Sequence, residues 1–327
     1  MSAEPMQNPS PRTARSSLQN PSPRTAGSSL RSRIPRAAGA PIETHSQADG
    51  QWNQLDWVPT TVYWGIHVLA LGVFVVGGST TDLVLFAVTF WPRIFFVTGG
   101  YHRYFSHKTY RTSRPFQLAL AFLGTTCVQK GPLWWASLHR HHHRYSDQPE
   151  DVHSPRRGFW YSHQAWIEDP EWQATRVELI PDFAKYPELR FLNKWHVIGP
   201  AALIGVCIAV GGLSGFLWGF CLSTTLLWHS TYTINSLSHR WGKVRYETGD
   251  DSRNNWVLAL LTLGEGWHNN HHRYQASARN GFYWWEVDLT YYVLLGLEKV
   301  GLIWDLRQPP AAVLAEGRGE APARKAA

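Results

Sequence analysis

Cysteine is scarce in this sequence, and the few cysteines do not have the spacing of a metal-binding or redox pair. The 327 residues include only Cys127, Cys207 and Cys221, each in an apolar stretch and none in a C-x-x-C pair. This pattern excludes a disulfide framework and a cysteine-based zinc site. We expect the three thiols to be small residues of the core.

Acidic residues are in the minority, and an N-terminal apolar segment is lacking. Lys and Arg number 31 against 24 Asp and Glu, a formal net charge of +7, and no apolar run precedes residue 50. We therefore expect no secretory signal peptide. A basic chain suits nucleic acid or an anionic membrane surface, but no nucleic-acid-binding motif is found. The 18 tryptophans cluster beside apolar runs, which favours contact with membrane lipids and no nucleic-acid partner.

Both ends of the chain have the composition of disordered segments. Residues 1–50 are rich in Ser, Pro, Arg and Ala, and the 12-residue stretch QNPSPRTARSSL at 7–18 recurs at 19–30 as QNPSPRTAGSSL. Such segments cannot bury enough apolar surface to order themselves. We expect a disordered basic tail over 1–50, a membrane domain over 51–308 and a disordered tail over 309–327.

Four apolar spans follow the N-terminal tail. They cover about 58–76, 83–101, 196–213 and 216–236, each near the ~20 residues needed to cross a bilayer. The short joins GGSTTD and GGLSG link the first two and the last two. The expected fold is an all-α integral membrane protein with four transmembrane helices in two hairpins and a helical cap.

The distribution of basic residues predicts the orientation. Neither join contains Lys or Arg, whereas the tail, the 102–195 segment and the C-terminal third contain nearly all of them. The positive-inside rule then places both termini and the cap in the cytosol, at a bacterial inner membrane or the endoplasmic reticulum. The stretch at 116–128 is too short to cross, and the stretch at 284–306 suits a surface-lying amphipathic helix.

One charge lies inside the second span. Arg93 follows Pro92 in this span, and a charge at that depth is costly and often functional. The favoured interpretation is structural: a proline-kinked helix whose arginine snorkels to the interface, or a span shifted by half a turn.

Histidine is abundant and regularly spaced. Nine of the 16 histidines form a pattern: H-x-x-x-x-H at His102 and His107, H-x-x-H-H at His139, His142 and His143, the same triplet at His268, His271 and His272, and His239 alone in NSLSH.

The spacing predicts a metal centre. Residues i, i+3 and i+4 share one helix face, so each triplet is expected to aim three imidazoles at one point. Residues i and i+5 lie about 140° apart on a helix, so His102 and His107 are expected to straddle a helix end. So many imidazoles exceed the needs of one metal and indicate two.

Several metals suit this donor set. Imidazole binds zinc, copper, iron and nickel, while structural zinc usually includes cysteine. The Glu plus Glu-x-x-His pattern of soluble di-iron bundles is absent. An all-histidine di-iron centre at the membrane surface therefore suits oxygen chemistry, and a polar interface patch is the structural alternative.

The remaining histidines have simpler interpretations. His153 and His163 are candidate hydrogen-bond partners of the metal ligands. His67 and His229 are expected to be packed, hydrogen-bonded residues of the spans. His141 points off the face of its triplet, although it permits a rival register.

The four motifs GGYHRYFSH, HRHHHRYSD, NSLSH and GEGWHNNHH resemble, in order and spacing, the histidine boxes of membrane-bound fatty acid desaturases of the stearoyl-CoA (delta-9) type. The resemblance covers about residues 55–305 and includes DVHSPRRGFWYSH after the second box. It implies that the nine patterned histidines bind two irons and that Asn235 holds a water on the iron with fewer histidines. It also implies that Gln129, Trp135 and Thr231 line the bend of an acyl channel.

The resemblance implies an O2-dependent oxidoreductase. Two adjacent methylenes of a saturated C16–C18 acyl chain would lose hydrogen, giving a cis double bond most often at carbon 9, while O2 and two electrons form water. A related membrane di-iron hydroxylase is the alternative enzyme, and a metal transporter or store is the non-enzymatic alternative.

Two departures from the family pattern concern the partners. Animal members have Arg-Asp before the second box, where this chain has Ser137 and Leu138, and a later basic pair is replaced by Asp169 and Pro170. Lys130 can compensate only in part, so the head group stays open among CoA, a carrier-protein thioester and a glycerolipid. No HPGG-type haem segment is found, so the electron donor is expected to be a separate ferredoxin or small cytochrome with its reductase.

Overall fold

Helices make up nearly all of the regular structure in residues 58–320, the part of the chain that the computed structural model describes. The α-helices are α1 (Val58–Ala70), α2 (Val73–Val76), α3 (Thr80–Phe95), α4 (Arg114–Thr125), α5 (Pro132–Tyr145), α6 (Phe159–His163), α7 (Pro181–Ala184), α8 (Pro187–Lys194), α9 (Ile198–Gly215), α10 (Ser223–Ser236), α11 (Trp256–Leu261), α12 (His268–Arg273), α13 (Leu289–Lys299) and α14 (Ala311–Gly317). The predicted tail over 1–50, with its repeat, lies outside the described residues.

Tighter and wider helices connect these elements. Two are π-helices, η1 (Phe96–Ser106) and η6 (Phe216–Leu222). Five are 3-10 helices: η2 (Pro155–Arg157), η3 (Ala165–Ile167), η4 (Pro170–Trp172), η5 (Val177–Leu179) and η7 (Leu237–His239). Strands β1 (Arg111–Thr112) and β2 (Ile303–Trp304) pair antiparallel, with Arg111 opposite Trp304.

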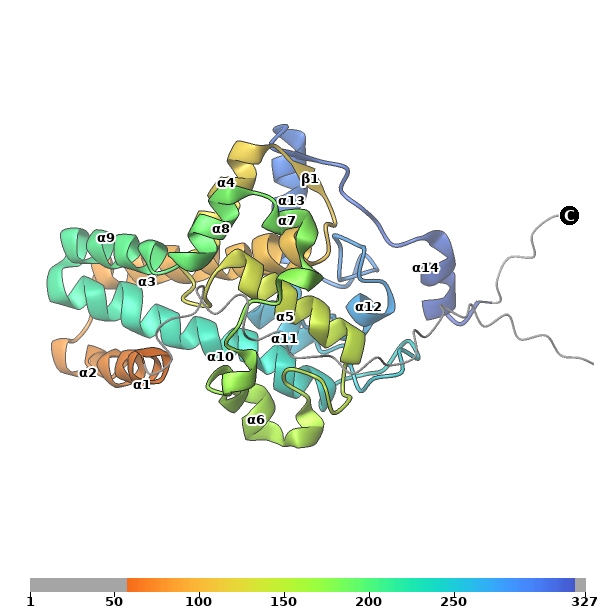
Figure 1. The fold of residues 1–327 in the computed structure, drawn as a ribbon, viewed down its shortest axis with the longest axis horizontal. Coiled ribbons are helices and arrows are strands. Elements are labelled where there is room, and N and C mark those ends of the chain that lie inside the picture. The colour runs from red at the N-terminus through yellow and green to blue at the C-terminus, as the bar shows by residue number, and fades with distance from the viewer. Residues whose placement is uncertain (1–57, 321–327) are drawn as a thin grey trace, which may run out of the picture. The chain divides into compact units, whose positions relative to one another are not determined.

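The first hairpin turns where the sequence predicts. Gly77 ends α2 with a φ of 72°, a conformation that favours glycine. Ser79 then starts α3 with a capping box, in which its Oγ accepts from Asp82 N (3.2 Å) and its own N donates to Asp82 Oδ2 (2.9 Å). In Figure 1, α1 and α3 run in opposite directions from this turn.

The second hairpin turns at a glycine inside α9. Gly212 has φ 58° and ψ −142°, which breaks the helix. Past the break the chain reverses, and a Cβ added at Gly215 would lie 2.5 Å from the carbonyl oxygen of Cys207. This close approach of η6 to α9 explains the glycine, and Figure 1 shows α9 and α10 running in opposite directions.

Among the described residues, two helical segments are long and apolar enough to cross a membrane: Thr80–Ser106, and Ile198–His239 with its break at Gly212. The shorter apolar helix Thr60–Val76 falls in the first expected span. α1, α3, α9 and α10 gather on one side of Figure 1, and α5, α6 and α12 on the other. The fold is therefore mostly helical, with two candidate membrane helices.

The C-terminal third differs from the sequence expectation in two places. The stretch at 284–306 forms a helix only over α13, and its end pairs as β2 with β1. α14 lies inside the segment predicted as a tail from 309. Val313 of α14 is buried and its carbonyl accepts from Tyr246 Oη (3.0 Å), so regular packing extends past residue 308.

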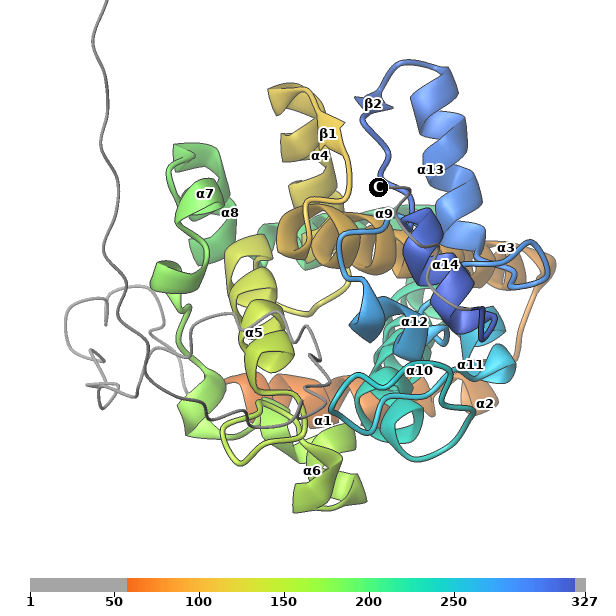
Figure 2. The same ribbon diagram turned by 90° about the vertical axis from the view of Figure 1, so that its right-hand side faces the viewer.

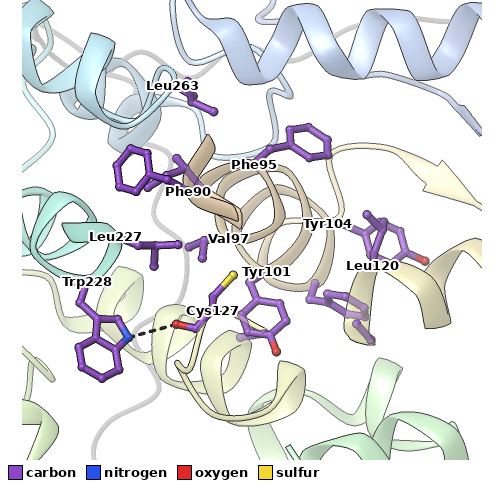
Figure 3. Packing of buried hydrophobic residues seen from close by; sticks show 14 of the residues in the cluster. Phe90, Phe95, Val97, Tyr101, Tyr104, Leu120, Cys127, Leu227, Trp228 and Leu263 are labelled. Atoms are coloured by element: carbon purple, nitrogen blue, oxygen red, sulfur yellow. Dashed lines mark hydrogen bonds between the residues drawn. The ribbon is translucent and has the colours of Figure 1, made fainter. Parts of the chain in front are cut away.

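The buried apolar core surrounds η1. Tyr101 and Phe105 on η1 are fully buried, and Figure 3 shows Tyr101 near Cys127 and the side chains of neighbouring helices. Trp228 Nε1 donates to the carbonyl oxygen of Cys127 (3.1 Å), which ties α10 to the end of α4. All three cysteines are buried and unpaired, so the prediction of small core residues is confirmed.

Arg93 does not snorkel. Its side chain is 3% exposed, and its guanidinium donates to Ser223 Oγ (3.0 Å) and Thr224 Oγ1 (2.9 Å). The arginine therefore fastens α3 to α10, because two hydroxyls of the opposite helix each accept a hydrogen bond from it.

Candidate metal centre

The first histidine pair lies on a π-helix. Residues 96–106 form η1, and His107 N donates to the carbonyl oxygen of His102 (3.2 Å), an i+5 to i hydrogen bond. Such backbone is rare and frequent at functional sites. It brings the two imidazole centres to 4.9 Å. His102 lies within η1 and His107 directly follows its last residue, Ser106, so the pair straddles a helix end as expected.

The two H-x-x-H-H triplets lie on α5 and α12, and each divides between two clusters. His139 and His143 of α5 join one cluster, while His142 joins the other. On α12 the division is reversed, because the i+3 member His271 joins the first cluster and His268 and His272 the second. The expectation that each triplet aims at one point is therefore wrong.

Histidine group 1 combines the first pair with both triplets. Its members are His102, His107, His139, His143 and His271, whose ligand atoms lie within 4.8 Å of one another. Four Nε2–Nε2 distances connect them: His102–His271 (3.0 Å), His107–His139 (2.8 Å), His139–His143 (3.0 Å) and His143–His271 (2.9 Å). The Nε2 atoms thus converge on one point.

Histidine group 2 is smaller and fully buried. It consists of His142, His239, His268 and His272, again within 4.8 Å. The Nε2 atoms of His239 and His268 are 3.0 Å apart, and those of His142 and His272 are buried with no hydrogen-bond partner. In Figure 2, α12 lies near α10, and η7, which follows α10 in the chain, carries His239.

Four carboxylates orient the imidazoles from behind. Each accepts a hydrogen bond from an Nδ1 atom: Glu265 from His102 (2.6 Å), Asp151 from His142 (2.8 Å), Asp147 from His239 (2.9 Å) and Asp250 from His272 (2.7 Å). A neutral imidazole with its hydrogen on Nδ1 presents a lone pair at Nε2. This arrangement is typical of metal-binding histidines, whose far nitrogen is held by a carboxylate.

The donor set fits two metal ions. Lone pairs that face one another at hydrogen-bond distance, together with the unpartnered Nε2 atoms of group 2, are satisfied by a cation between them. Burial, reinforced by charges on neighbouring histidines, holds the pKa of His143 and of His268 well below the usual range. Both rings are therefore neutral near pH 7, as metal ligands must be.

The carboxylates stay ionised in this buried environment. Burial alone raises the pKa of Asp151, but its interaction with His142 outweighs burial and the pKa falls below its usual value. Asp250 behaves in the same way beside His272. Each negative charge is held near a histidine group that would carry a metal cation.

An arginine contacts one of the carboxylates that hold the imidazoles. Arg103 follows His102 on η1, and it donates to Glu265 Oε1 (2.9 Å) and Asp288 Oδ1 (3.0 Å). Glu265, Asp147, Asp151 and Asp250 were not predicted from the sequence as part of the site. Their only signal was proximity to the boxes, for example Glu265 three residues before His268.

The other histidines within residues 58–320 lie outside the two groups. His141 bonds the carbonyl oxygen of Glu150 through Nε2 (2.8 Å), which does not favour the rival register. The ring of His153 lies 4.4 Å from that of His142, and the two form a further metal-capable set with Asp151. His163 is elsewhere, hydrogen-bonded to His229 (3.0 Å).

The three residues assigned to the acyl channel form one hydrogen-bonded line. Trp135 Nε1 donates to Gln129 Oε1 (2.9 Å), and Gln129 Nε2 donates to Thr231 Oγ1 (2.9 Å). The Trp135 ring stacks on His139 with centroids 5.0 Å apart, so the line begins at group 1. Asn235 is half-buried on α10, four residues before His239.

Group 1 is open to one side. A hollow of about 430 Å³ is lined by His107 and His143 of the group and by Arg140 and Arg144 of α5. Arg140 is held by Asp182 (2.8 Å), whereas Arg144 is exposed. The hollow gives molecules outside the protein a route to group 1.

Comparison with known proteins agrees with this geometry. Residues 79–299 match the family model described as fatty acid desaturase. The Acyl-CoA 5-desaturase AL21 of Anemone leveillei is 38% identical over 79% of this chain and 81% of its own length. The sn-1 stearoyl-lipid 9-desaturase of Anabaena variabilis is 35% identical over 78% and 94%, and the Delta-9 acyl-lipid desaturase 2 of Arabidopsis thaliana is 35% identical over 81% and 87%. The chain therefore belongs to the fatty acid desaturase family.

Proposed function

We propose that this desaturase introduces a cis double bond at carbon 9 of a saturated C16–C18 acyl chain, using O2 and two electrons. The observation that carries the proposal is the contact between Trp135 and His139. It joins the line of Gln129 and Thr231, the proposed channel bend, directly to histidine group 1. A hydroxylase would need a similar metal centre, but the similarity to named desaturases favours desaturation.

The nine histidines of the two groups are the proposed ligands of two iron ions. Iron bound there supplies the activation of O2 and the removal of hydrogen from two adjacent methylenes. The protein's own contribution is position. Glu265 and the three aspartates fix the orientation of four imidazole rings, and burial of group 2 keeps bulk water away from it. Asn235 is proposed to hold a water near group 2.

The channel line is proposed to set the reacting carbon. Trp135 places a large ring beside His139, and its hydrogen bond to Gln129 fixes the ring's orientation. A bend at this point would stop a straight acyl chain from sliding, because dispersion contacts along a narrow tunnel depend on register. Mid-chain methylenes would then lie beside group 1 in a reactive geometry.

We infer that the acyl chain is presented on a glycerolipid. Ser137 and Leu138, which replace the Arg-Asp of the animal enzymes, are 0% and 4% exposed. Ser137 Oγ donates to the carbonyl oxygen of Trp134 (2.9 Å). Neither residue can meet the phosphates of CoA, and Asp169 adds a negative charge at one position of the basic pair of the animal enzymes.

The membrane arrangement is also proposed. We infer four crossings in two hairpins, with both termini and a helical cap on the cytosolic side of a bacterial inner membrane or the endoplasmic reticulum. The breaks at Gly77 and Gly212 support reversals at these joins, which contain no Lys or Arg. A separate ferredoxin, or a small cytochrome with its reductase, would deliver electrons. Tags at Met1 and Ala327 should be reachable only from the cytosol.

The decisive experiment is expression in a host that lacks its own desaturase. Gas chromatography–mass spectrometry of derivatised lipids should locate a cis double bond at carbon 9, and His271→Ala serves as the inactive control. Feeding labelled acyl-lipid or acyl-CoA to membranes distinguishes the carriers. A hydroxylated product, or a double bond only near the methyl end, would contradict the proposal.

A further inference from the structure

The loop between α4 and α5 holds two residues in a backbone conformation that their side chains disfavour. Val128 has a φ of 56° and Lys130 a φ of 58°. Both values are positive, which is uncommon for a non-glycine residue and an outlier for a β-branched one such as valine. Gln129, the middle residue of the proposed channel line, lies between them. Strain of this kind persists only where the surrounding structure holds it, and it clusters at functional sites.

Two buried aromatic side chains anchor the strained residues through their carbonyl oxygens. Tyr101 Oη donates to the carbonyl oxygen of Lys130 (3.1 Å), and Trp228 Nε1 donates to that of Val128 (3.2 Å). The indole shares its hydrogen with the preceding carbonyl oxygen of the loop (3.1 Å). Tyr101 directly precedes His102 of group 1 on η1. The strained loop is therefore tied to the helix that carries the first pair of histidines.

The hydrogen bonds of the channel line can run in one direction only. An indole N–H only donates, so Trp135 Nε1 fixes Oε1 of Gln129 as its acceptor and leaves Nε2 to donate to Thr231 Oγ1. The Thr231 hydroxyl in turn donates to the carbonyl oxygen of Trp228 (2.9 Å). The ring of Trp228 then returns to Val128, next to Gln129. This closed circuit is satisfied by a single orientation of the Gln129 amide.

We propose that Val128 and Lys130 are positioning residues whose strained backbone keeps the Gln129 amide at the channel bend. The two aromatic anchors prevent the return of either φ to a negative value. Such a return would rotate the backbone beside Gln129 and withdraw its amide from Trp135 and Thr231. The inference rests on the proposed function, and it assigns the choice of the reacting carbon to the loop as well as to the Trp135 ring.

The test combines Tyr101→Phe with Lys130→Gly in the full chain. Tyr101→Phe removes the anchoring hydroxyl and keeps the ring, so the backbone at Lys130 is free to relax to a negative φ. The fraction of double bonds away from the main position should rise about fivefold, the factor that corresponds to one net hydrogen bond, with bound iron retained. Glycine adopts a positive φ without steric cost. Tyr101→Phe should therefore shift the products much less in the Lys130→Gly background.

Tyr110→Phe is the matched control. Tyr110 is also a buried tyrosine whose hydroxyl donates to a backbone carbonyl oxygen, that of Gly99 (2.8 Å), which is outside the loop. This substitution removes the same group from the core, so it should lower thermal stability without moving the double bond. An equal shift of double-bond position in Tyr101→Phe and Tyr110→Phe would indicate a general loss of packing and overturn the proposal.

Thermal unfolding of the same four proteins, wild type, both single variants and the double variant, is a readout that needs no turnover. Tyr101→Phe should lower the unfolding temperature less in the wild type than in the Lys130→Gly background, because relief of strain offsets part of the lost hydrogen bond only where strain exists. Trp228→Phe with Val128→Gly repeats the comparison at the other anchor. Additive effects on product position or on unfolding temperature overturn the proposal. A wild type that forms no unsaturated product contradicts the proposed function instead, and the unfolding comparison still tests the anchored strain.

Discussion

Histidine groups 1 and 2 are built from the same two triplets and yet differ in environment. Group 1 has five imidazoles, three of them half-buried, with one carboxylate, Glu265, hydrogen-bonded to a member. Group 2 has four fully buried imidazoles, three of which donate to aspartates. Group 1 also contacts the hollow on one side and Trp135 on the other.

This difference in environment indicates that the two groups have different roles. More carboxylates around group 2 add negative charge, which suits a cation held in a closed, water-poor site. Group 1 is placed where outside molecules and the proposed channel can both approach. We therefore expect group 1 to determine substrate position and group 2 to depend most on its aspartates, and the following predictions test that contrast.

The largest effect is expected from removing one histidine of each group. His271→Ala should empty group 1 and His142→Ala group 2, with turnover reduced by more than ~10²-fold, since even partners behind the ligands cost 10–100-fold. Iron per protein by elemental analysis and product by gas chromatography–mass spectrometry are the measurements. Activity close to wild type would remove the altered residue from the proposed ligands.

The next effect concerns the carboxylates. Asp151→Asn and Glu265→Gln should each lower metal affinity or activity about 10–100-fold, the first through group 2 and the second through group 1. Glu265→Gln should also lower the free energy of unfolding, because Arg103 is buried and loses one of two charged partners. Chelator titration and thermal unfolding measure the two effects. Equal thermal stability of both variants would contradict this assignment for Arg103.

A moderate effect is expected at the contact between group 1 and the channel line. Trp135→Ala opens a cavity beside His139 and removes the hydrogen bond to Gln129. Activity should fall and double bonds should appear at several positions, with iron retained. The positional distribution of the products decides the matter, and one unchanged position would show that Trp135 does not shape the bend.

The smallest effect is expected at His141, the histidine of the second box that joins neither group. His141→Ala removes its hydrogen bond to Glu150, worth about 1 kcal/mol, and leaves all nine proposed ligands in place. Turnover and bound iron should change much less than in His142→Ala. A complete loss of activity would instead support the rival register of the box.

The sequence by itself determined which histidines come together, but not how they are divided between groups 1 and 2. The spacing of the boxes identified all nine histidines that the structure brings together. On an α-helix, however, i+4 lies about 40° to one side of i and i+3 about 60° to the other. A triplet such as His139, His142 and His143 can therefore face one metal ion or be divided between two. The way α5 and α12 lie against each other divides it between two histidine groups.

Local patterns also determined the hairpin turns, because glycines and the serine cap at Ser79 act through their own backbone. The π-helical path of η1 has no such local signature, since its i+5 hydrogen bonds exist only when the surrounding core holds them. The same is true of the contacts that Glu265 and the aspartates make with the histidines. These contacts join segments far apart in the chain, so only the tertiary structure could decide them.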